Sequence, residues 1–106
     1  MGDRLMELIC MFDLPVLTAR NRRAYRQFKK FLDKMGFVML EESVYCRMIP
    51  NGATMKSTKA AFREHRPPSG LVALLVVTEK QFANMEFITG KHVSNVLSSM
   101  DSVAVI

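Results

Sequence analysis

Asp13 is the residue of this sequence best placed for metal-dependent chemistry. It follows the apolar stretch from Leu5 to Phe12 and precedes Leu14 and Pro15, so its carboxylate is expected to project from the end of a buried strand. Mg²⁺ is usually held by one or two carboxylates together with waters and substrate phosphates. A lone Asp13 is therefore a poor site, whereas two copies facing each other in a two-fold dimer could share an ion. An aspartate before Leu-Pro is also typical of a turn or cap, and that alternative stays open.

The other reactive side chains form no recognisable catalytic set. His65 lies between basic residues and His92 follows a lysine, so both histidines are expected to be solvated. Cys10 and Cys46 lie in apolar stretches without a CxxC spacing, which predicts reduced core residues rather than a zinc site. Asp13 is thus the one candidate catalytic residue, and no evident general base accompanies it.

The segment from Thr18 to Met35 is strongly cationic. It carries seven basic residues and one acid, Asp33, so its local charge of +6 exceeds the net charge of +5 of the whole chain. Like charges three or four residues apart destabilise a helix, so a sequence that tolerates them indicates a polyanionic partner. A solvated helix face is the simpler alternative. The candidate nucleic-acid contacts, acting on phosphates without reading base sequence, are Arg20, Arg22, Arg23, Arg26, Lys29 and Lys30.

The same segment has the periodicity of an amphipathic helix. Thr18 suits the N-cap, and apolar side chains recur at spacings of three and four until Gly36 supplies a stop. A second, weaker helix is predicted over residues 53–66, before two consecutive prolines. The apolar arc of the first helix is expected to anchor it, which leaves its cationic arc available to a partner.

Strands are predicted on both sides of these helices. Residues 5–12 and 71–77 are apolar at nearly every position, which is typical of buried strands. Residues 37–49 predict two short strands with a break at residues 41–43. The predicted order is therefore strand, helix, strand, strand, helix, strand.

That order indicates an α+β, ferredoxin-like βαββαβ sandwich. We expect a single domain over residues 1–106, with a core of residues 1–90 and a C-terminal strand or tail of residues 91–106. The further elements expected are a brief helix capped by Thr78 and Gln81 and short strands at residues 85–89 and 102–106.

The apolar strands also predict how the sheet is covered. Both helices of a ferredoxin-like fold pack on one sheet face, yet residues 5–12 and 71–77 are apolar on both faces instead of alternating. The second face needs a cover, because monomers avoid large exposed apolar patches. A second copy of the chain is the simplest cover and predicts a homodimer through apolar sheet faces. The alternative is that the chain's own tail folds back over the sheet.

No segment predicts contact with a membrane. The apolar run from Leu5 to Phe12 is short, carries Glu7 and lacks a cleavage site, so it does not resemble a signal peptide. No stretch approaches the roughly 20 apolar residues that cross a bilayer. A cytoplasmic protein without a membrane partner is expected.

Several short stretches of the sequence form a recognisable set. They are Phe12-Asp13-Leu14-Pro15, Arg22 to Leu32, Gly36-Phe37, Ser43-Val44-Tyr45, Arg63-Glu64-His65 and Thr78 to Phe82. Taken together they resemble the Cas-two family, the small CRISPR-associated adaptation proteins, in the version found in type II systems. The resemblance covers about residues 5–90.

The resemblance implies a ferredoxin-like homodimer whose C-terminal strand crosses to the partner protomer. It also implies partnership with the Cas-one integrase, in which the dimer bridges two integrase dimers and holds the double-stranded DNA of an incoming protospacer during spacer acquisition. By similarity Asp13 matches the family's metal-linked aspartate. The alternative function is therefore a Mg²⁺-dependent endonuclease acting on RNA or double-stranded DNA through paired Asp13 side chains. One acid per protomer without an evident general base favours the scaffold.

Overall fold

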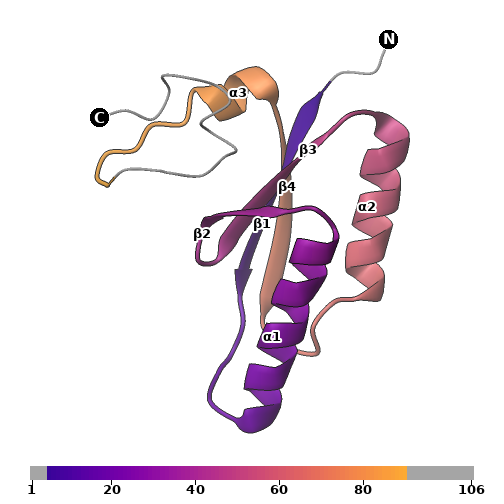
Figure 1. The fold of residues 1–106 in the computed structure, drawn as a ribbon, viewed down its shortest axis with the longest axis vertical. Coiled ribbons are helices and arrows are strands. Elements are labelled where there is room, and N and C mark those ends of the chain that lie inside the picture. Colours follow the sequence, from indigo (N-terminus) through magenta and orange to yellow (C-terminus); the bar gives the residue numbers. More distant parts are fainter. Residues whose placement is uncertain (1–4, 91–106) are drawn as a thin grey trace.

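The computed structural model describes residues 5–90 (Figure 1). Its elements are β1 (Met6–Asp13), α1 (Ala19–Lys34), β2 (Val38–Glu41), β3 (Val44–Ile49), α2 (Gly52–Glu64), β4 (Leu71–Thr78) and α3 (Glu79–Ala83). The strands form one antiparallel sheet in the order β2-β3-β1-β4. This arrangement confirms the predicted α+β, ferredoxin-like fold. The strand expected at residues 102–106 and the residue His92 lie outside the described part of the chain.

The helices begin and end where local side chains satisfy their backbone. Thr18 caps α1 by accepting from the Asn21 amide at 3.0 Å, and the Asn21 side chain accepts from the Thr18 amide at 3.3 Å. Gly36, with φ of +86°, follows the last turn. Helix α2 ends at Glu64, two residues earlier than predicted. The reason is that Arg66 precedes a proline, which disfavours helical backbone at that position.

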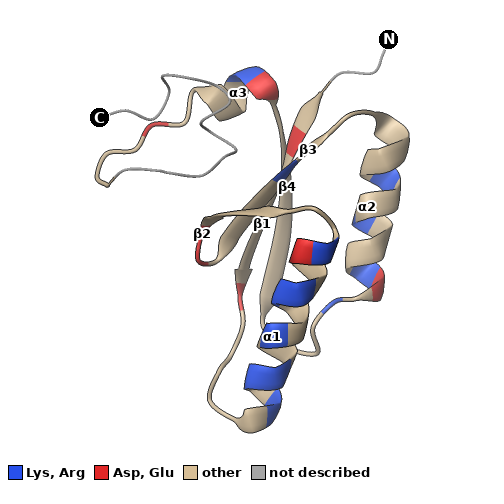
Figure 2. Cartoon of the chain, in the orientation of Figure 1, with Lys and Arg blue, Asp and Glu red and all other residues tan. Residues whose placement is uncertain are grey.

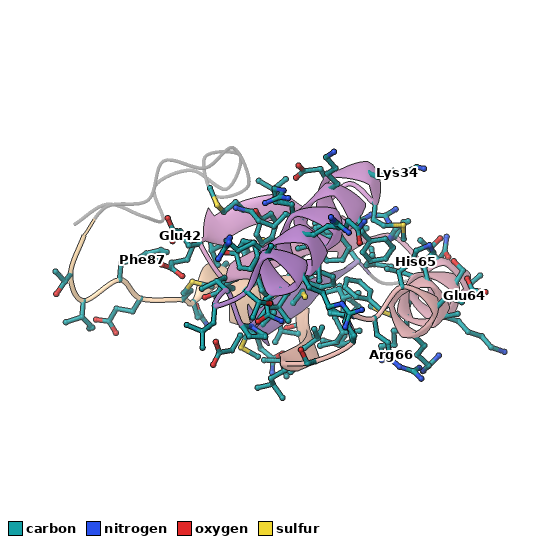
Figure 3. All side chains as sticks on the ribbon, turned by 90° about the horizontal axis from the view of Figure 1, so that it is seen from below. Lys34, Glu42, Glu64, His65, Arg66 and Phe87 are labelled. Atoms are coloured by element: carbon teal, nitrogen blue, oxygen red, sulfur yellow. The ribbon has the colours of Figure 1, made fainter. Side chains whose placement is uncertain are left out.

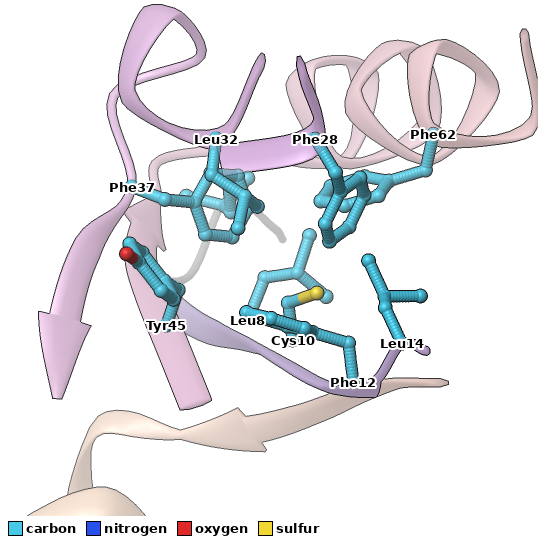
Figure 4. Close-up of a cluster of buried hydrophobic side chains, with 10 residues drawn as sticks. Leu8, Cys10, Phe12, Leu14, Phe28, Leu32, Phe37, Tyr45 and Phe62 are labelled. Atoms are coloured by element: carbon cyan, nitrogen blue, oxygen red, sulfur yellow. The ribbon is translucent and has the colours of Figure 1, made fainter. Parts of the chain in front are cut away.

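One face of the sheet is covered by α1 and α2 (Figure 4). Alternate residues of β1 point toward these helices, so Leu8, Cys10 and Phe12 pack with Phe28 and Phe62 from the helices. Fully burying one such side chain stabilises the fold by about 1.5–3 kcal/mol. This face holds the larger of the two apolar clusters, completed by Leu14, Leu32, Phe37, Tyr45 and Ile49.

The second face of the sheet is covered only in part. Phe82 of α3 packs on Ile9 and Cys46, and Met85 and Phe87 pack against this small cluster. The strand expected at residues 85–89 is therefore wrong: residues 85–87 have no regular structure. The Met85 amide donates to the Phe82 carbonyl at 3.1 Å, which turns the chain back over the sheet face instead of along a sheet edge.

The rest of the second face is apolar and exposed. Strand register places five exposed side chains on it: Met11 (38% exposed), Val38 (38%), Met48 (41%), Leu71 (63%) and Leu75 (47%). We call these five residues the apolar strip. Within residues 5–90 nothing covers them, and α3 with its following segment covers the remainder of that face. The chain itself therefore covers part of this face, and the second copy expected over the rest stays a prediction.

Two further expectations concern the cysteines and the membrane. Cys10 and Cys46 are buried free thiols, as predicted, and burial raises the pKa of each to about 12, so neither thiolate forms near neutral pH. In the part of the chain that the structure describes, no helix is long and apolar enough to cross a bilayer.

Candidate nucleic-acid interface

Positive charge gathers on the outer face of α1 (Figure 2). Phe28 and Leu32 bury the opposite face of the helix against the sheet. Its first turn carries no acidic residue, and within residues 5–90 its cations form no ion pair. The field of these charges is therefore not neutralised locally. We call the six predicted contacts the cationic strip: Arg20, Arg22, Arg23, Arg26, Lys29 and Lys30.

The structure separates two members of the cationic strip from the other four. One guanidinium nitrogen of Arg22 donates to the carbonyls of Val16 at 3.1 Å and Leu17 at 3.2 Å, which ties the loop between β1 and α1. Lys29 is half-buried, with its Nζ 5.5 Å from the centre of the Tyr25 ring. Both residues thus already have a structural role. The exposed members without such contacts are Arg20, Arg23, Arg26 and Lys30.

Helix α2 carries further cations. It lies beside α1 on the same sheet face, as the two views show (Figures 1 and 3). Its cationic positions are Lys56, Lys59 and Arg63, followed by Arg66, whose guanidinium donates to the Arg63 carbonyl at 3.2 Å. Lys59, Arg63 and Arg66 line a groove with Val72 and Leu74 of β4, so they lie on the side of α2 that faces β4, and the outer face of α1 remains the densest cationic surface.

Asp13 lies at the end of β1, as predicted, and its side chain is exposed. Gly70 packs against the backbone that carries it. A Cβ atom at Gly70 would lie 2.7 Å from the Asp13 carbonyl oxygen and 3.0 Å from Cδ of Pro15, and the φ of Gly70 is +95°. Only glycine fits this conformation and this space without strain. Gly70 therefore helps to position Asp13. The sequence did not indicate this role, because Pro-Pro-Ser-Gly before β4 predicts only a turn.

The donor chemistry of Asp13 fits Mg²⁺, but the number of donors in one chain falls short. Among residues 5–90 no group of three or more histidine, cysteine, aspartate or glutamate side chains gathers. Strand alternation and register place Asp13 on the same sheet face as Met11 and Leu71 of the apolar strip. A carboxylate here would need waters, substrate phosphate or a second copy of Asp13 to complete a coordination shell.

Glu7 is a buried acid to which the sequence patterns assign no role. Its side chain lies within β1 and is 1% exposed, and its Oε1 has no hydrogen-bond partner. Burial raises its pKa to about 7, and the nearby charge of Glu79 on α3 adds to the shift. The sequence signal that could have identified Glu7 is a carboxyl group within an otherwise apolar strand. It is the one acid of β1 held away from water.

His65 was predicted to be a solvated side chain. It is exposed, but it also contacts other residues of the protein. Its Nδ1 lies 3.0 Å from the Ala61 carbonyl oxygen at the end of α2. Its ring stacks on Phe31 of α1, with ring centres 4.8 Å apart and planes 19° apart. The two residues are far apart in the sequence, so no local pattern connects them. The contact joins the C-cap of α2 to the last turn of α1.

Comparison with known proteins assigns the family. The model of the family described as CRISPR associated protein Cas2 matches residues 6–85, most of the chain. The chain belongs to the Cas2 family. This is the Cas-two family that the sequence motifs resemble, and the match includes Asp13, the cationic strip and the whole sheet.

Relatives of similar length support the assignment to the Cas2 family. A protein of Treponema denticola is 41% identical over 101 residues, which cover 95% of this chain and 100% of the relative. A protein of Streptococcus mutans is 42% identical over 94 residues, which cover 89% of this chain and 86% of the relative. A protein of Lacticaseibacillus rhamnosus is 42% identical over 106 residues, which cover 95% of this chain and 100% of the relative. Each of these relatives is named CRISPR-associated endoribonuclease Cas2.

Proposed function

We propose that this chain is the DNA-binding scaffold of CRISPR spacer acquisition. A cytoplasmic homodimer binds the double-stranded DNA of a protospacer along the cationic strip and bridges two dimers of the Cas-one integrase. The observation that carries the proposal is the dense, un-neutralised charge on the outer face of α1, which is held rigidly by the buried face of the same helix.

The length of α1 suits a duplex. Its 16 residues extend about 24 Å at 1.5 Å per residue. Duplex DNA rises about 3.4 Å per base pair, so the helix is as long as roughly seven base pairs. Arginine side chains bind phosphate oxygens through charge-assisted hydrogen bonds, and displaced counterions favour the complex. These contacts hold a duplex without regard to its sequence, which is what a subunit that accepts any incoming spacer requires.

The apolar strip supports a homodimer in the same proposal. Five exposed apolar side chains on one sheet face form a surface that a second copy can bury. Residues 91–106 would cross to the partner protomer as the family resemblance implies. Because Asp13 lies on the same face, a two-fold contact through the strip would bring two copies of it toward each other.

Charge reversal tests the scaffold. Arg23→Glu is expected to weaken duplex binding and to reduce the slope of log affinity against log salt by about 0.9 for each phosphate that the variant no longer binds. Lys80→Glu changes the net charge equally but lies on α3, away from the strip, so it is the matched control. Gel-shift titrations at several salt concentrations and integration assays with the Cas-one integrase measure the effect. If Arg23→Glu binds and integrates DNA like the parent, the proposal is wrong.

The alternative function is a Mg²⁺-dependent endonuclease. The names of the relatives favour it, since each is called an endoribonuclease. Asp13, exposed at a rigid strand end, would hold the ion together with its copy in the dimer. When bound, Mg²⁺ would activate water and stabilise charge on the phosphate.

Asp13→Asn separates the two functions. The nuclease predicts that Mg²⁺-dependent cleavage of single-stranded RNA or double-stranded DNA is lost, while Asp33→Asn on α1 retains it. The scaffold predicts that both variants support integration. Cleavage that is absent from the parent, or unchanged in Asp13→Asn, removes the enzyme assignment for this residue.

A further inference from the structure

The loop between β1 and α1 presents two apolar side chains to solvent. Residues 14–17 form this loop, in which Leu17 is 88% exposed and Val16 is 49% exposed. The loop stands at one end of the longest axis of the molecule, opposite α3 (Figure 1). A lone exposed leucine is ordinary on a protein surface. Leu17 differs in how rigidly it is held and in what surrounds it.

The loop is held at both ends and from the side. Leu14 is buried in the larger apolar cluster, and the capping box of Thr18 fixes the start of α1. Between these two points, one guanidinium nitrogen of Arg22 donates to the carbonyls of Val16 and Leu17. An apolar tip held in this way loses little conformational freedom when it binds a partner.

The tip adjoins the cationic strip. Arg20 and Arg23 follow Leu17 by three and six residues, and both are exposed. Three residues span at most about 11 Å, so a phosphate bound by Arg20 lies close to the Leu17 side chain. The first turn of α1 carries no acidic residue, and Figure 2 shows its positive charge beginning next to the loop. A duplex bound by the cationic strip therefore lies against Leu17.

The minor groove of duplex DNA matches such a tip. The groove is about 6 Å wide, which admits a side chain but not a helix of about 10–12 Å in diameter. Its walls are the sugars between successive phosphates, and in DNA these sugars present C–H groups. The minor groove of an RNA duplex displays 2′-hydroxyl groups instead. An apolar side chain packed there would take a hydroxyl away from water without offering it a hydrogen bond, which is unfavourable.

We propose that Leu17 and Val16 pack in the minor groove of the duplex bound along the cationic strip and thereby favour deoxyribose over ribose. We call this the sugar-selective contact. The inference rests on the proposed function, and it makes the loop a determinant of specificity for DNA. Arg22 is a positioning residue for this contact, since its guanidinium holds the two carbonyls that fix the tip.

An apolar pocket on a partner protein is the competing occupant of the loop. The exposed arginines beside Leu17 would oppose such docking unless the pocket were rimmed by acids. A duplex supplies the negative charge and the groove together, so the surroundings of the loop favour the duplex.

The test compares a DNA duplex with an RNA duplex of the same length and base sequence, by fluorescence-anisotropy titration at one salt concentration. The full chain is expected to bind DNA at least about tenfold more tightly, in line with the cost of one buried hydroxyl without a partner. Leu17→Ser is expected to reduce the preference to about threefold or less, because its hydroxyl can bond to a 2′-hydroxyl. The variant should fold like the parent, since Leu17 is 88% exposed.

Ile88→Ser is the matched control for the apolar side chain. Ile88 is 80% exposed and follows the segment that packs on the second sheet face, away from the loop. This variant is expected to keep the parental preference for DNA.

A charge-matched pair tests the positioning role of Arg22. Arg22→Ala and Arg23→Ala each remove one positive charge from the cationic strip, but only Arg22→Ala releases the carbonyls of the loop. Arg23→Ala is expected to weaken DNA and RNA binding by the same factor and to keep the preference. Arg22→Ala is expected to lower the preference as Leu17→Ser does.

Three results would overturn the inference. Equal affinity of the parent for both duplexes leaves the proposed function standing and removes the sugar-selective contact. A parental preference in Leu17→Ser assigns the selectivity to other residues, and if that variant also loses binding to the integrase, the loop docks into a protein pocket instead. A parent that binds neither duplex contradicts the proposed function itself, and the sugar-selective contact is rejected with it.

Discussion

The two faces of the sheet differ in how completely this chain covers them. On the first face, α1 and α2 bury a continuous cluster that includes Phe12, Phe28 and Phe62. On the second face, α3 and residues 84–87 cover Ile9 and Cys46, while the apolar strip stays exposed and Glu7 is buried without a full set of partners. The first face supplies the stability of one chain. The second face holds the features that depend on pH and on a second copy.

Truncating the first face is expected to have the largest effect on stability. Phe28→Ala removes a ring that is 3% exposed and contacts Phe12 and Phe62, and the cavity left behind should lower the free energy of unfolding by about 3–5 kcal/mol. Met48→Ala on the apolar strip should cost less than about 1 kcal/mol in the monomer, because Met48 is 41% exposed. Urea denaturation at a concentration where the protein is monomeric measures both. Equal losses would contradict the contrast between the faces.

Glu7 is expected to make stability depend on pH. Its pKa is about 7 in the folded chain and 4.5 for the unperturbed carboxyl, so the folded state favours the protonated form. The contribution of Glu7 to the free energy of unfolding should be greatest below pH 4.5, decline as the pH rises toward 7, and level off above that, with a loss of up to about 3 kcal/mol.

Glu7→Gln should remove this decline, because the amide does not ionise. Denaturation midpoints measured from pH 4 to pH 9 compare the variant with the parent. Glu41→Gln, an exposed acid at the end of β2, is the control and should keep the parental profile. A decline that persists in Glu7→Gln would assign the pH dependence to another group.

A charge on the apolar strip is expected to separate the dimer. Leu75→Glu would place an unpaired carboxylate in the proposed interface, which should raise the dimer dissociation constant at least about a hundredfold, or roughly 2.7 kcal/mol. Light scattering over a dilution series measures it. Leu17→Glu makes the same change in the loop before α1, at a residue that is 88% exposed, and should leave association unchanged. A parent that is monomeric at every concentration would contradict the dimer.

The smallest effect is expected at the turn beside Asp13. Gly70→Ala forces a Cβ against the Asp13 carbonyl at positive φ and should lower the free energy of unfolding by about 1–3 kcal/mol. Gly52→Ala begins α2 where no atom lies within 4 Å of the added Cβ, so it should be neutral or slightly stabilising. Thermal denaturation compares the two variants. A loss in Gly52→Ala as large as that in Gly70→Ala would show that the close contact is not responsible.

Much of the fold was predictable because its signals are local. The caps at Thr18 and Thr78, the break before Val44 and the apolar runs of β1 and β4 each depend on a few neighbouring residues. The expected strand at residues 85–89 was wrong because Met85 and Phe87 look like strand residues but pack on the sheet face through contacts distant in the sequence.

The candidate site was predictable less completely. Helical periodicity alone predicts that the side chains of Arg20, Arg23 and Arg26 are exposed, and they are. The loop contacts of Arg22 and the half-buried position of Lys29 depend on Val16, Leu17 and Tyr25, and no sequence pattern predicts them. Gly70 signals only a turn in the sequence, because its closeness to Asp13 arises when β4 pairs with β1.

The sequence by itself determined the order of elements, the amphipathic helix with its charge, and the place of Asp13 at a strand end, because periodicity, capping and composition act within a few residues. Only the tertiary structure decided that Phe31 stacks on His65, that Glu7 is buried, and which apolar residues of the second face stay exposed. These features depend on which distant segments meet, and that is set by the packing of the whole sheet and its helices.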